Sequence, residues 1–341
     1  MRDTLILANS RSRAARLVAG SSAASELVGR SDAIGRVQEL LRLAAPLDSG
    51  VLLVGERGID APSVAHELHA RSRPAAAPWI AIDCSDDGVR IDRSLFGTAR
   101  SHGPTDLESV SSDSRTAAAR GGTLFLREVT ELPSGIQARL TRIVRDGEVR
   151  VDGEVVPTGV RFVASALPSI DGDVREHRFR ADLYRRLAAS RIDLPPLRDR
   201  LEDVPMLATK LLEEYSGTAG NPPRNFTQAA LALLAAHRWP GNLTELRALV
   251  ERVASETRDD AIQIEQLLPV LQLDRATTAF VPAGSLRDAR LRFERDYIAA
   301  VLQHHGWRMA DAAQTLGIQR PNLYRKARQL GIRLARVSEE G

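Results

Sequence analysis

Residues 51–62, VLLVGERGIDAP, decide the first expectation about the fold. The apolar run VLLV predicts a buried strand, because a short continuous apolar run that ends at a glycine is typical of strands covered on both faces. The residues after the loop have helical character, so the stretch reads strand, loop, helix. A loop in this setting is where many proteins bind a phosphate group, and its residues therefore decide whether this chain binds one.

The same alternation continues on both sides of this stretch. Upstream, apolar residues at helical spacing predict a helix over residues 31–45. Downstream, helical stretches separate three further apolar runs at residues 79–82, 123–126 and 160–164. Such alternation predicts a parallel sheet covered by helices, an α/β fold.

The strand pattern stops at about residue 201. Helices are predicted over residues 207–215, 228–237 and 243–256, and a last helical unit from residue 286 to about 335. Between them, residues 274–284, DRATTAFVPAG, break the periodicity and predict a linker. Residues 1–24 show no sustained period and are expected to form a flexible arm.

Composition and charge narrow the function. The chain has 43% hydrophobic and 27% charged residues and no apolar run near the roughly 20 residues that cross a bilayer, so we expect a cytoplasmic protein without membrane contact. The single cysteine, Cys84, excludes an internal disulfide and a multi-cysteine metal site, and we predict no metal site. Residues 286–341 carry eleven basic and six acidic residues, a balance of +5 that leaves −2 for residues 1–285. Nucleic acid is therefore expected to bind at the C-terminal end.

This end contains a candidate DNA-binding motif, WRMADAAQTLGIQRPNLYRKARQLGI, at residues 307–332. Its small residues and glycine allow a short helix to turn tightly into a second one. The second helix carries Arg320, Asn322, Tyr324, Arg325, Lys326 and Arg328. Arginine and asparagine can pair with guanine and adenine edges, while Lys326 suits a phosphate. The alternative is a solvated basic helix that closes a helical domain.

The motif resembles the Fis-type helix-turn-helix, with Asn322 where that family usually has threonine. The resemblance implies that the preceding helix dimerises. The DNA site would then be a pair of half-sites related by a two-fold axis.

A second set of motifs lies upstream: LVGRSDAIGRVQELLRLAAP, PWIAIDCSD, SLFG, GGTLFL, FRADLYRRL with RIDLPPLRDRLEDVPMLA, and WPGNLTELRALVER. Together these motifs resemble the AAA+ domain of sigma-54-dependent activators of the NtrC type. The resemblance implies an α/β AAA+ core over residues 25–200, a small helical lid over 201–273, a linker over 274–285 and an all-α helix-turn-helix domain over 286–341. Members of that family hydrolyse ATP as a ring and use a loop to remodel RNA polymerase that carries sigma-54.

The phosphate loop departs from the family's pattern, GESGTGKE. Gly55, Glu56 and Gly58 are kept, but the second signature glycine is Asp60, the lysine is Ala61, and a proline follows. In such loops the glycines let N–H groups converge on the phosphates and the lysine supplies a cation. Asp60 adds a negative charge and Ala61 removes the cation, so we expect no phosphate to bind.

Other nucleotide-facing positions depart in the same direction. At the end of GGTLFL the family's Asp-Glu pair is Arg127 and Glu128, and an arginine has no lone pair to offer magnesium. The asparagine that pairs with the catalytic glutamate is Asp83, the sensor asparagine is Ala166 and the lid's sensor arginine is Thr244. Glu128 is thus a relict, and ATP and magnesium would be cofactors only if this degenerate site were still competent.

Three arginines in the core have candidate roles. We hypothesise that Arg127 forms a salt bridge with Asp60 or fills the space of the missing phosphates. Arg180 and Arg186, in FRADLYRR, match the family's arginine fingers, which reach into the neighbouring subunit's nucleotide site. Alternatively, these two arginines pair with Asp182 or with other surface acids.

The sigma-54 contact loop also differs. After SLFG the family continues to GAFTGA, whereas residues 98–110 here read TARSHGPTDLESV, with no aromatic residue in the place of the loop's phenylalanine. We therefore expect a polar loop without the surface that engages sigma-54.

The sequence favours a DNA-binding transcriptional regulator built on a nucleotide-incompetent AAA+ core. Two alternatives stay open: an active ring ATPase that activates sigma-54 promoters, and a non-catalytic subunit of a mixed ring that donates Arg180 and Arg186 to an active relative. The expected partners are double-stranded DNA, further copies of the chain as a dimer or higher oligomer, and an active AAA+ relative or RNA polymerase.

Overall fold

The computed structural model describes residues 25–99, 106–219, 224–257, 259–278 and 320–330, with single positions at 298, 302, 307, 309, 310 and 313. The chain forms two compact units, residues 1–271 and 272–341. The expected arm, residues 1–24, lies outside the described residues, as does the expected linker beyond residue 278.

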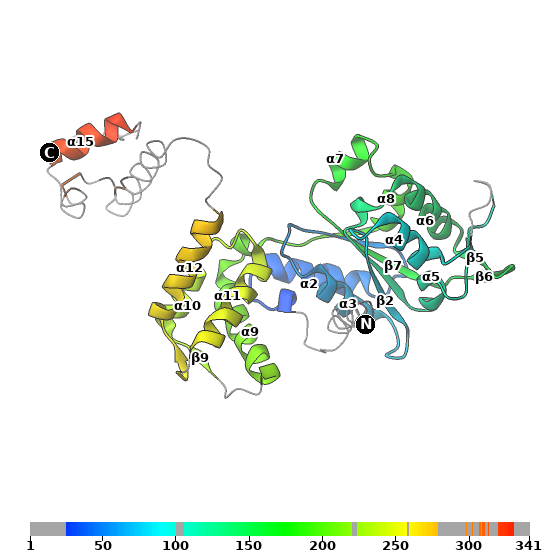
Figure 1. Cartoon of the computed structure of the whole chain (residues 1–341), viewed down its shortest axis with the longest axis horizontal. Helices are drawn as coiled ribbons and strands as arrows, with labels where there is room; N and C mark the ends of the chain where they lie inside the picture. Colours follow the sequence, from blue (N-terminus) through cyan, green and yellow to red (C-terminus); the bar gives the residue numbers. More distant parts are fainter. Residues whose placement is uncertain are drawn as a thin grey trace, which may run out of the picture. The chain divides into compact units, whose positions relative to one another are not determined.

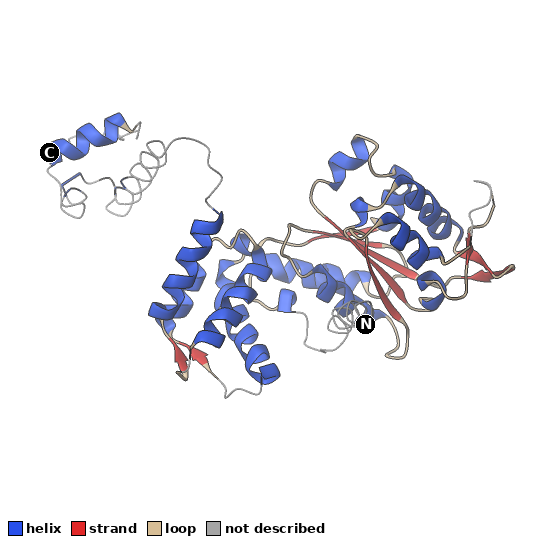
Figure 2. Ribbon diagram, in the orientation of Figure 1, coloured by secondary structure: helices blue, strands red, loops and turns tan. Residues whose placement is uncertain are grey.

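A five-stranded parallel sheet forms the centre of the first unit (Figures 1 and 2). Its strands, in spatial order, are β2 (Trp79–Asp83), β4 (Thr123–Arg127), β7 (Arg161–Ala166), β1 (Val51–Val54) and β8 (Ser190–Asp193). The four strands predicted from the sequence are confirmed within two residues at each end, and β8 is an addition. Because the strands are parallel, the loops that follow β1, β2, β4 and β7 meet at one edge of the sheet.

Alternate strand residues face two separate cores. Leu52 and Val54 pack on one side of the sheet, and Val51 and Leu53 pack on the other. The first side is covered by α4 (Gly88–Phe96), α6 (Ser134–Asp146), α7 (Ile170–Arg175) and α8 (Ala181–Leu187), and the second by α2 (Asp32–Ala44) and α3 (Ala61–Ser72) (Figure 1). Burial on both faces explains why the strands are continuous apolar runs in the sequence.

Helix α2 begins and ends with side-chain caps. The Oγ of Ser31 accepts a hydrogen bond from the Ile34 N–H (3.3 Å), which satisfies one of the unpaired donors of the first turn. At the other end the buried Arg161 donates to the carbonyl of Ala44 (2.6 Å) and to that of the next residue (3.1 Å). The helix predicted over residues 31–45 is confirmed.

A helical lid forms the C-terminal part of the first unit, which ends at residue 271 within the lid's last helix. Its elements are α9 (Val204–Ala219), β9 (Asn225–Phe226), α10 (Gln228–Ala236), α11 (Asn242–Glu256), β10 (Ala261–Ile262) and α12 (Ile264–Thr278). They pack around Trp239, which is fully buried and donates its Nε1–H to the carbonyl of Leu234 (2.9 Å).

Two expectations about this region were wrong. The strand pattern does not end at residue 201, because β9 and β10 pair in parallel, although two-residue strands leave no periodic signal. Helix α12 continues to Thr278, so residues 274–278 are helical and not part of a linker.

A small second sheet lies beside the core. It consists of β3 (Ser109–Val110), β5 (Glu148–Val151) and β6 (Glu154–Pro157). β3 pairs with β5 in parallel, so the polar loop expected over residues 98–110 is wrong for its last two residues. Residues 100–105 of that stretch lie outside the described residues.

The second unit contains α15 (Arg320–Gln329). Its Leu323 is fully buried and packs with Ile298, Leu302 and Met309. The dimerisation expected of the preceding helix concerns residues that are mostly outside the described part. Among the described residues, no helix is both long enough and apolar enough to span a bilayer.

Candidate functional site

A cavity of about 700 Å³ lies at the carboxyl edge of the large sheet. The loop after β1, the ends of β4 and β7, and the start of α11 form its wall. Its charged side chains are Glu56, Arg57, Asp60, Arg127, Glu128, Glu131 and Arg247. The structure thus brings the predicted phosphate loop, the end of GGTLFL and the lid together around one space.

The glycines of the loop keep its shape. The Gly55 N–H donates to the carbonyl of Ala166 at the end of β7 (3.1 Å), which fixes the loop to the sheet. Gly58 has a φ of +86°, and a Cβ added there would lie 2.1 Å from the carbonyl oxygen of Gly241 in the lid. Only glycine satisfies both the backbone conformation and this close approach.

Asp60 caps helix α3. Its Oδ1 accepts a hydrogen bond from the Ser63 N–H (3.2 Å) and its Oδ2 one from the Ser63 Oγ–H (2.6 Å). The carboxylate therefore uses a helix N-terminal N–H that would otherwise be open to an anion. Ala61, the first residue of α3, has only a methyl group where the family's loop has an ammonium.

Glu26, which the sequence analysis missed, occupies another donor of the loop. Its Oε2 accepts the Asp60 N–H (2.9 Å), and its carboxylate forms an ion pair with Arg200. Both side chains are 1% exposed, and Arg200 also donates to the backbone carbonyl of Glu26 (2.6 Å). No local pattern reveals this pair, because the two residues are 174 positions apart in the chain.

The lid contacts the loop directly. Asn242 donates from Nδ2 to the Arg57 carbonyl (2.9 Å), and its Oδ1 accepts the Leu197 N–H (2.8 Å). Thr244, in the place of the lid's sensor arginine, donates its N–H (3.0 Å) and its Oγ–H (3.1 Å) to the Gly58 carbonyl. These contacts join the lid to the loop through backbone carbonyls.

Arg127 lies at the end of β4 and forms a salt bridge with Asp83 at the end of β2 (Nη1 to Oδ2, 3.1 Å). The hypothesis that Arg127 pairs with Asp60 is therefore wrong, because the neighbouring strand supplies a carboxylate and Asp60 is used by Ser63. Asp83 also accepts the Ser85 Oγ–H (2.6 Å). A guanidinium beside this carboxylate does not fit a magnesium ion, which needs oxygen ligands.

Glu128 lies next to this pair in a left-handed backbone conformation, with φ +55°. Its N–H donates to the Ser165 Oγ of β7 (3.1 Å). Burial raises the pKa of the Glu128 carboxyl, and the positive charges of Arg127 and Arg57 oppose that rise. Ala166 follows Ser165 at the end of β7 and offers no polar group to the cavity.

The two candidate arginine fingers lie at α8. Arg180, the residue before the helix, forms a two-point salt bridge with Asp182 (3.0 and 2.6 Å), the alternative that the sequence left open. Arg186 is exposed on the same helix. Arg180 thus has an ion-pair partner within its own chain.

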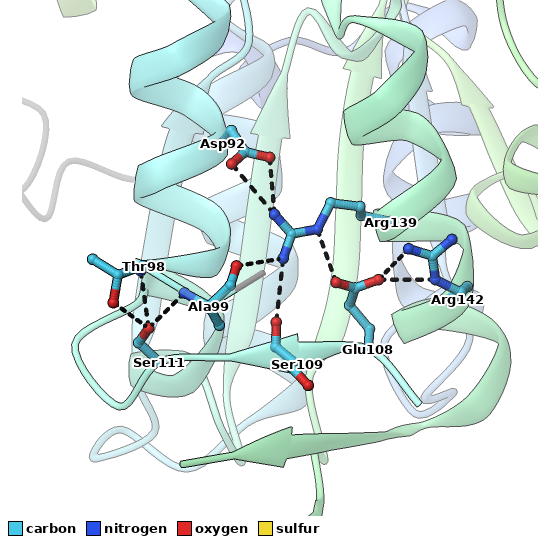
Figure 3. A network of polar contacts seen from close by, with 8 residues as sticks. All are labelled: Asp92, Thr98, Ala99, Glu108, Ser109, Ser111, Arg139 and Arg142. Carbon is cyan, nitrogen blue, oxygen red and sulfur yellow. Dashed lines mark hydrogen bonds and ion pairs between the residues drawn. The ribbon is translucent and has the colours of Figure 1, made fainter. Parts of the chain in front are cut away.

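The flanks of the stretch at residues 98–110 are tied to α6 (Figure 3). Glu108 is buried and forms ion pairs with Arg139 (2.8 Å) and Arg142. Arg139 also donates to the carbonyls of Ala99 (3.1 Å) and Ser109 (3.2 Å). One buried arginine thus joins both ends of the stretch, and sequence analysis gave no sign of it.

Helix α15 presents the predicted DNA-binding side chains. Leu323 and Ala327 are fully buried. The exposed positions include Arg320, Asn322, Tyr324, Arg325 and Arg328, whereas Lys326 is half-buried. No described residue of α15 is acidic.

Three family matches cover most of the chain. Residues 27–193 match the sigma-54 interaction domain, residues 198–280 the AAA+ ATPase lid domain, and residues 290–330 the bacterial regulatory proteins of the Fis family.

Individual relatives agree with these matches. The chain is 36% identical to the nitric oxide reductase transcription regulator NorR2 of Cupriavidus necator, over 90% of this chain and 63% of that protein. It is 32% identical to the nitrogen assimilation regulatory protein NtrX of Azorhizobium caulinodans, over 90% of this chain and 69% of that protein. A crystal structure of NtrX from Brucella abortus in complex with ATP has a TM-score of 0.63 and 31% identity, over 97% of this chain and 76% of that one. The chain spans slightly less than two thirds of the length of the NorR proteins of Cupriavidus necator.

Proposed function

The chain belongs to the family of NtrC-type sigma-54-dependent transcriptional regulators, and from this premise we propose that it is a DNA-binding transcriptional regulator whose AAA+ core does not bind nucleotide. DNA recognition comes from α15, and the core serves as a platform for assembly or interaction.

The main support for the proposal is that carboxylates of the chain itself already accept hydrogen bonds from backbone N–H groups of the loop and of the start of α3. Glu26 accepts the Asp60 N–H, and Asp60 accepts the Ser63 N–H. A polyphosphate at this loop would have to displace these acceptors and then lie beside their negative charges. Ala61 supplies no cation to offset that repulsion.

The metal position supports the same conclusion. Magnesium at a nucleotide is held by oxygen ligands, and the residue at the end of β4 is Arg127. Its guanidinium donates hydrogen bonds only and repels a divalent cation. Nucleotide binding would therefore lack both the lysine and the metal.

DNA binding is supported by the exposed side chains of α15. Arg325 and Asn322 suit base edges, and the other cations of the helix suit phosphates. The helix begins at Arg320, so these groups lie within its first three turns. A recognition helix that enters the major groove contacts bases with such positions.

The first experiment is equilibrium binding of a fluorescent ATP analogue with Mg²⁺, at protein concentrations that allow ring formation. We expect no binding up to millimolar nucleotide. The matched control is the triple variant Asp60→Gly, Ala61→Lys, Arg127→Asp, which restores the family's residues and should gain affinity. Micromolar binding of the analogue by the unmodified chain would contradict the proposal that the AAA+ core does not bind nucleotide.

A second candidate function is the active ring ATPase. Two observations favour it: the cavity is retained, and Glu128 still lies at its wall with a raised pKa. This candidate requires Mg²⁺-dependent ATP turnover that Glu128→Gln abolishes. Turnover that survives Glu128→Gln indicates a contaminating ATPase and leaves the first proposal in place.

A further inference from the structure

Contacts between the core and the lid converge on the junction at residues 197–203, and none of them requires a ligand. Asp203, which is buried, accepts hydrogen bonds from the Arg30 N–H (2.7 Å), the Ser31 N–H (3.0 Å) and the Ser31 Oγ–H (2.6 Å). Arg200 holds the backbone and the carboxylate of Glu26. The segment that precedes α2 is thereby fixed to the start of the lid.

The phosphate loop is held to the same junction from the other side. Glu56 forms a two-point ion pair with Arg198 (2.6 and 2.7 Å). Asn242 connects the Arg57 carbonyl to the Leu197 N–H, so that one side chain spans the loop, the junction and the lid. It is 1% exposed and has a left-handed backbone conformation, with φ +52°.

Thr244 completes the contact. Its N–H and its hydroxyl both donate to the Gly58 carbonyl, and the absence of a side chain at Gly58 lets the Gly241 carbonyl approach closely. In this family's pattern the equivalent position carries the sensor arginine, so its charged contact to a nucleotide is replaced by a neutral contact to the protein itself.

We infer that the lid is held closed on the core by the chain's own hydrogen bonds and ion pairs, so that its position does not depend on nucleotide. This inference rests on the proposed function, because it assigns the closed state to a core that works without ligand. We call this set of contacts the lock. Asn242 is its positioning residue. The other contacts of the lock are those of Thr244, of Glu56 with Arg198, and of Glu26 with Arg200. The platform therefore has one stable geometry between core and lid.

Two backbone amides report on the lock directly. The Thr244 N–H donates to Gly58, and the Asp60 N–H donates to Glu26, so both hydrogens exchange with solvent only when these contacts open. The measurement is hydrogen–deuterium exchange of the full chain, resolved for peptides over residues 55–64 and 241–250, without nucleotide and with millimolar ATP and Mg²⁺. We expect slow exchange in both peptides and no change on addition of ATP.

Variants separate the lock from overall stability. Asn242→Gly keeps the left-handed backbone and removes two side-chain hydrogen bonds, so both peptides should exchange about tenfold faster or more, while peptides of β1 and β7 stay unchanged. Thr244→Val, at an exposed position, removes the hydroxyl contact alone and gives a smaller increase in the same two peptides. Arg252→Gln, an exposed change on the same helix but outside the lock and the cavity wall, should leave both peptides unaffected.

The outcomes distinguish the inference from the proposed function. Fast exchange that slows only when ATP is added would overturn the inference, as would acceleration by Asn242→Gly that extends equally through the sheet. If the fluorescent analogue binds but exchange is already slow and does not change, the proposed incompetence fails and the inference stands. If nothing binds and exchange is fast, the inference fails and the proposed function stands.

Discussion

At the scale of single residues, Asp60 stands where the related family has a glycine and caps helix α3. A glycine at this position leaves the first turn of α3 open to an anion, whereas Asp60 closes it with a carboxylate that accepts the Ser63 N–H. Aspartate in place of the family's glycine therefore adds a helix cap. The sequence indicated the charge, but the capping geometry required the structure.

This role predicts the effect of substituting Asp60. Asp60→Ala removes the cap and should lower the free energy of unfolding by about 0.5–2 kcal/mol. Asp60→Asn keeps a capping oxygen and should stay close to the unmodified protein. Urea denaturation of the three proteins measures the difference. Equal losses for alanine and asparagine would show that the charge, and not the cap, stabilises the helix.

His69 makes stability depend on pH. The residue is buried on α3, its Nδ1 lies 2.8 Å from the Thr123 Oγ1, and burial is the main cause that lowers its pKa. His66 and Arg73 lower it further through their positive charge. As pH falls below the unfolded value of about 6.5, the unfolded chain binds a proton that folded His69 still refuses. Stability supplied by neutral His69 is thus present above that pH and is lost as pH falls.

The matched test uses His69→Gln, which keeps a polar contact to Thr123 without titrating, and the exposed neighbour variant His66→Gln. Free energies of unfolding are measured between pH 8 and pH 5. The decline in stability on acidification should be shallower in His69→Gln than in the unmodified protein, and nearly unaltered in His66→Gln. Parallel curves for all three proteins would show that His69 is not the titrating group.

At the scale of elements, the sequence predicted the strands and helices that have a strong period. The buried strands β1, β2, β4 and β7 and the lid helices α9, α10 and α11 follow from continuous apolar runs and from helical spacing. The strands that were missed are β3, β5, β6, β8, β9 and β10, of two to four residues each. Unlike the equally short β1, whose four residues are all apolar, none of these strands has an apolar run of more than two residues, so each is defined by its pairing partner and local analysis could not find it.

Among the contacts of these short strands, we expect the ion pairs between the residue before β3 and helix α6 to contribute most to the free energy of unfolding. Glu108 has no exposed side-chain area and pairs with Arg139 and Arg142, so its neutralisation removes a buried carboxylate from two largely buried guanidinium groups, of which Arg139 keeps its ion pair with Asp92 (3.0 Å). Glu108→Gln should lower the free energy of unfolding by about 3–5 kcal/mol, since removal of one partner from a buried ion pair is costly. Chemical denaturation gives the value. The control is Glu39→Gln, which removes an exposed pair with Arg42 on α2 and should leave stability unchanged.

At the scale of the whole molecule, the sequence predicted which segments surround the site but not which residues contact one another there. The loop at Gly55, the pair Arg127 and Glu128, and Thr244 were expected around one site, and the cavity contains all of them. The missing information was long-range: Glu26 reaches the loop, and Asn242 reaches it from the lid. Such contacts join residues that are far apart in the chain. They follow from the packing of the fold, and a local sequence pattern does not contain that information.

Net charge is unevenly distributed between residues 286–341 and the rest of the chain. Residues 286–341 carry a balance of +5 and the rest of the chain −2, so the salt dependence of DNA binding should come from the C-terminal end. Each phosphate contact contributes about −0.9 to the slope of log K against log salt concentration.

With a duplex selected from a random library, Lys326→Ala should make this slope shallower by about 0.9 and weaken binding to selected and scrambled duplexes alike. Arg325→Ala should instead reduce discrimination between the two duplexes by about 1–3 kcal/mol, because it removes a contact to a base edge. Arg252→Ala, an exposed change in the lid, is the control and should alter neither quantity. Affinity that stays constant across a tenfold range of salt would contradict DNA recognition by this helix.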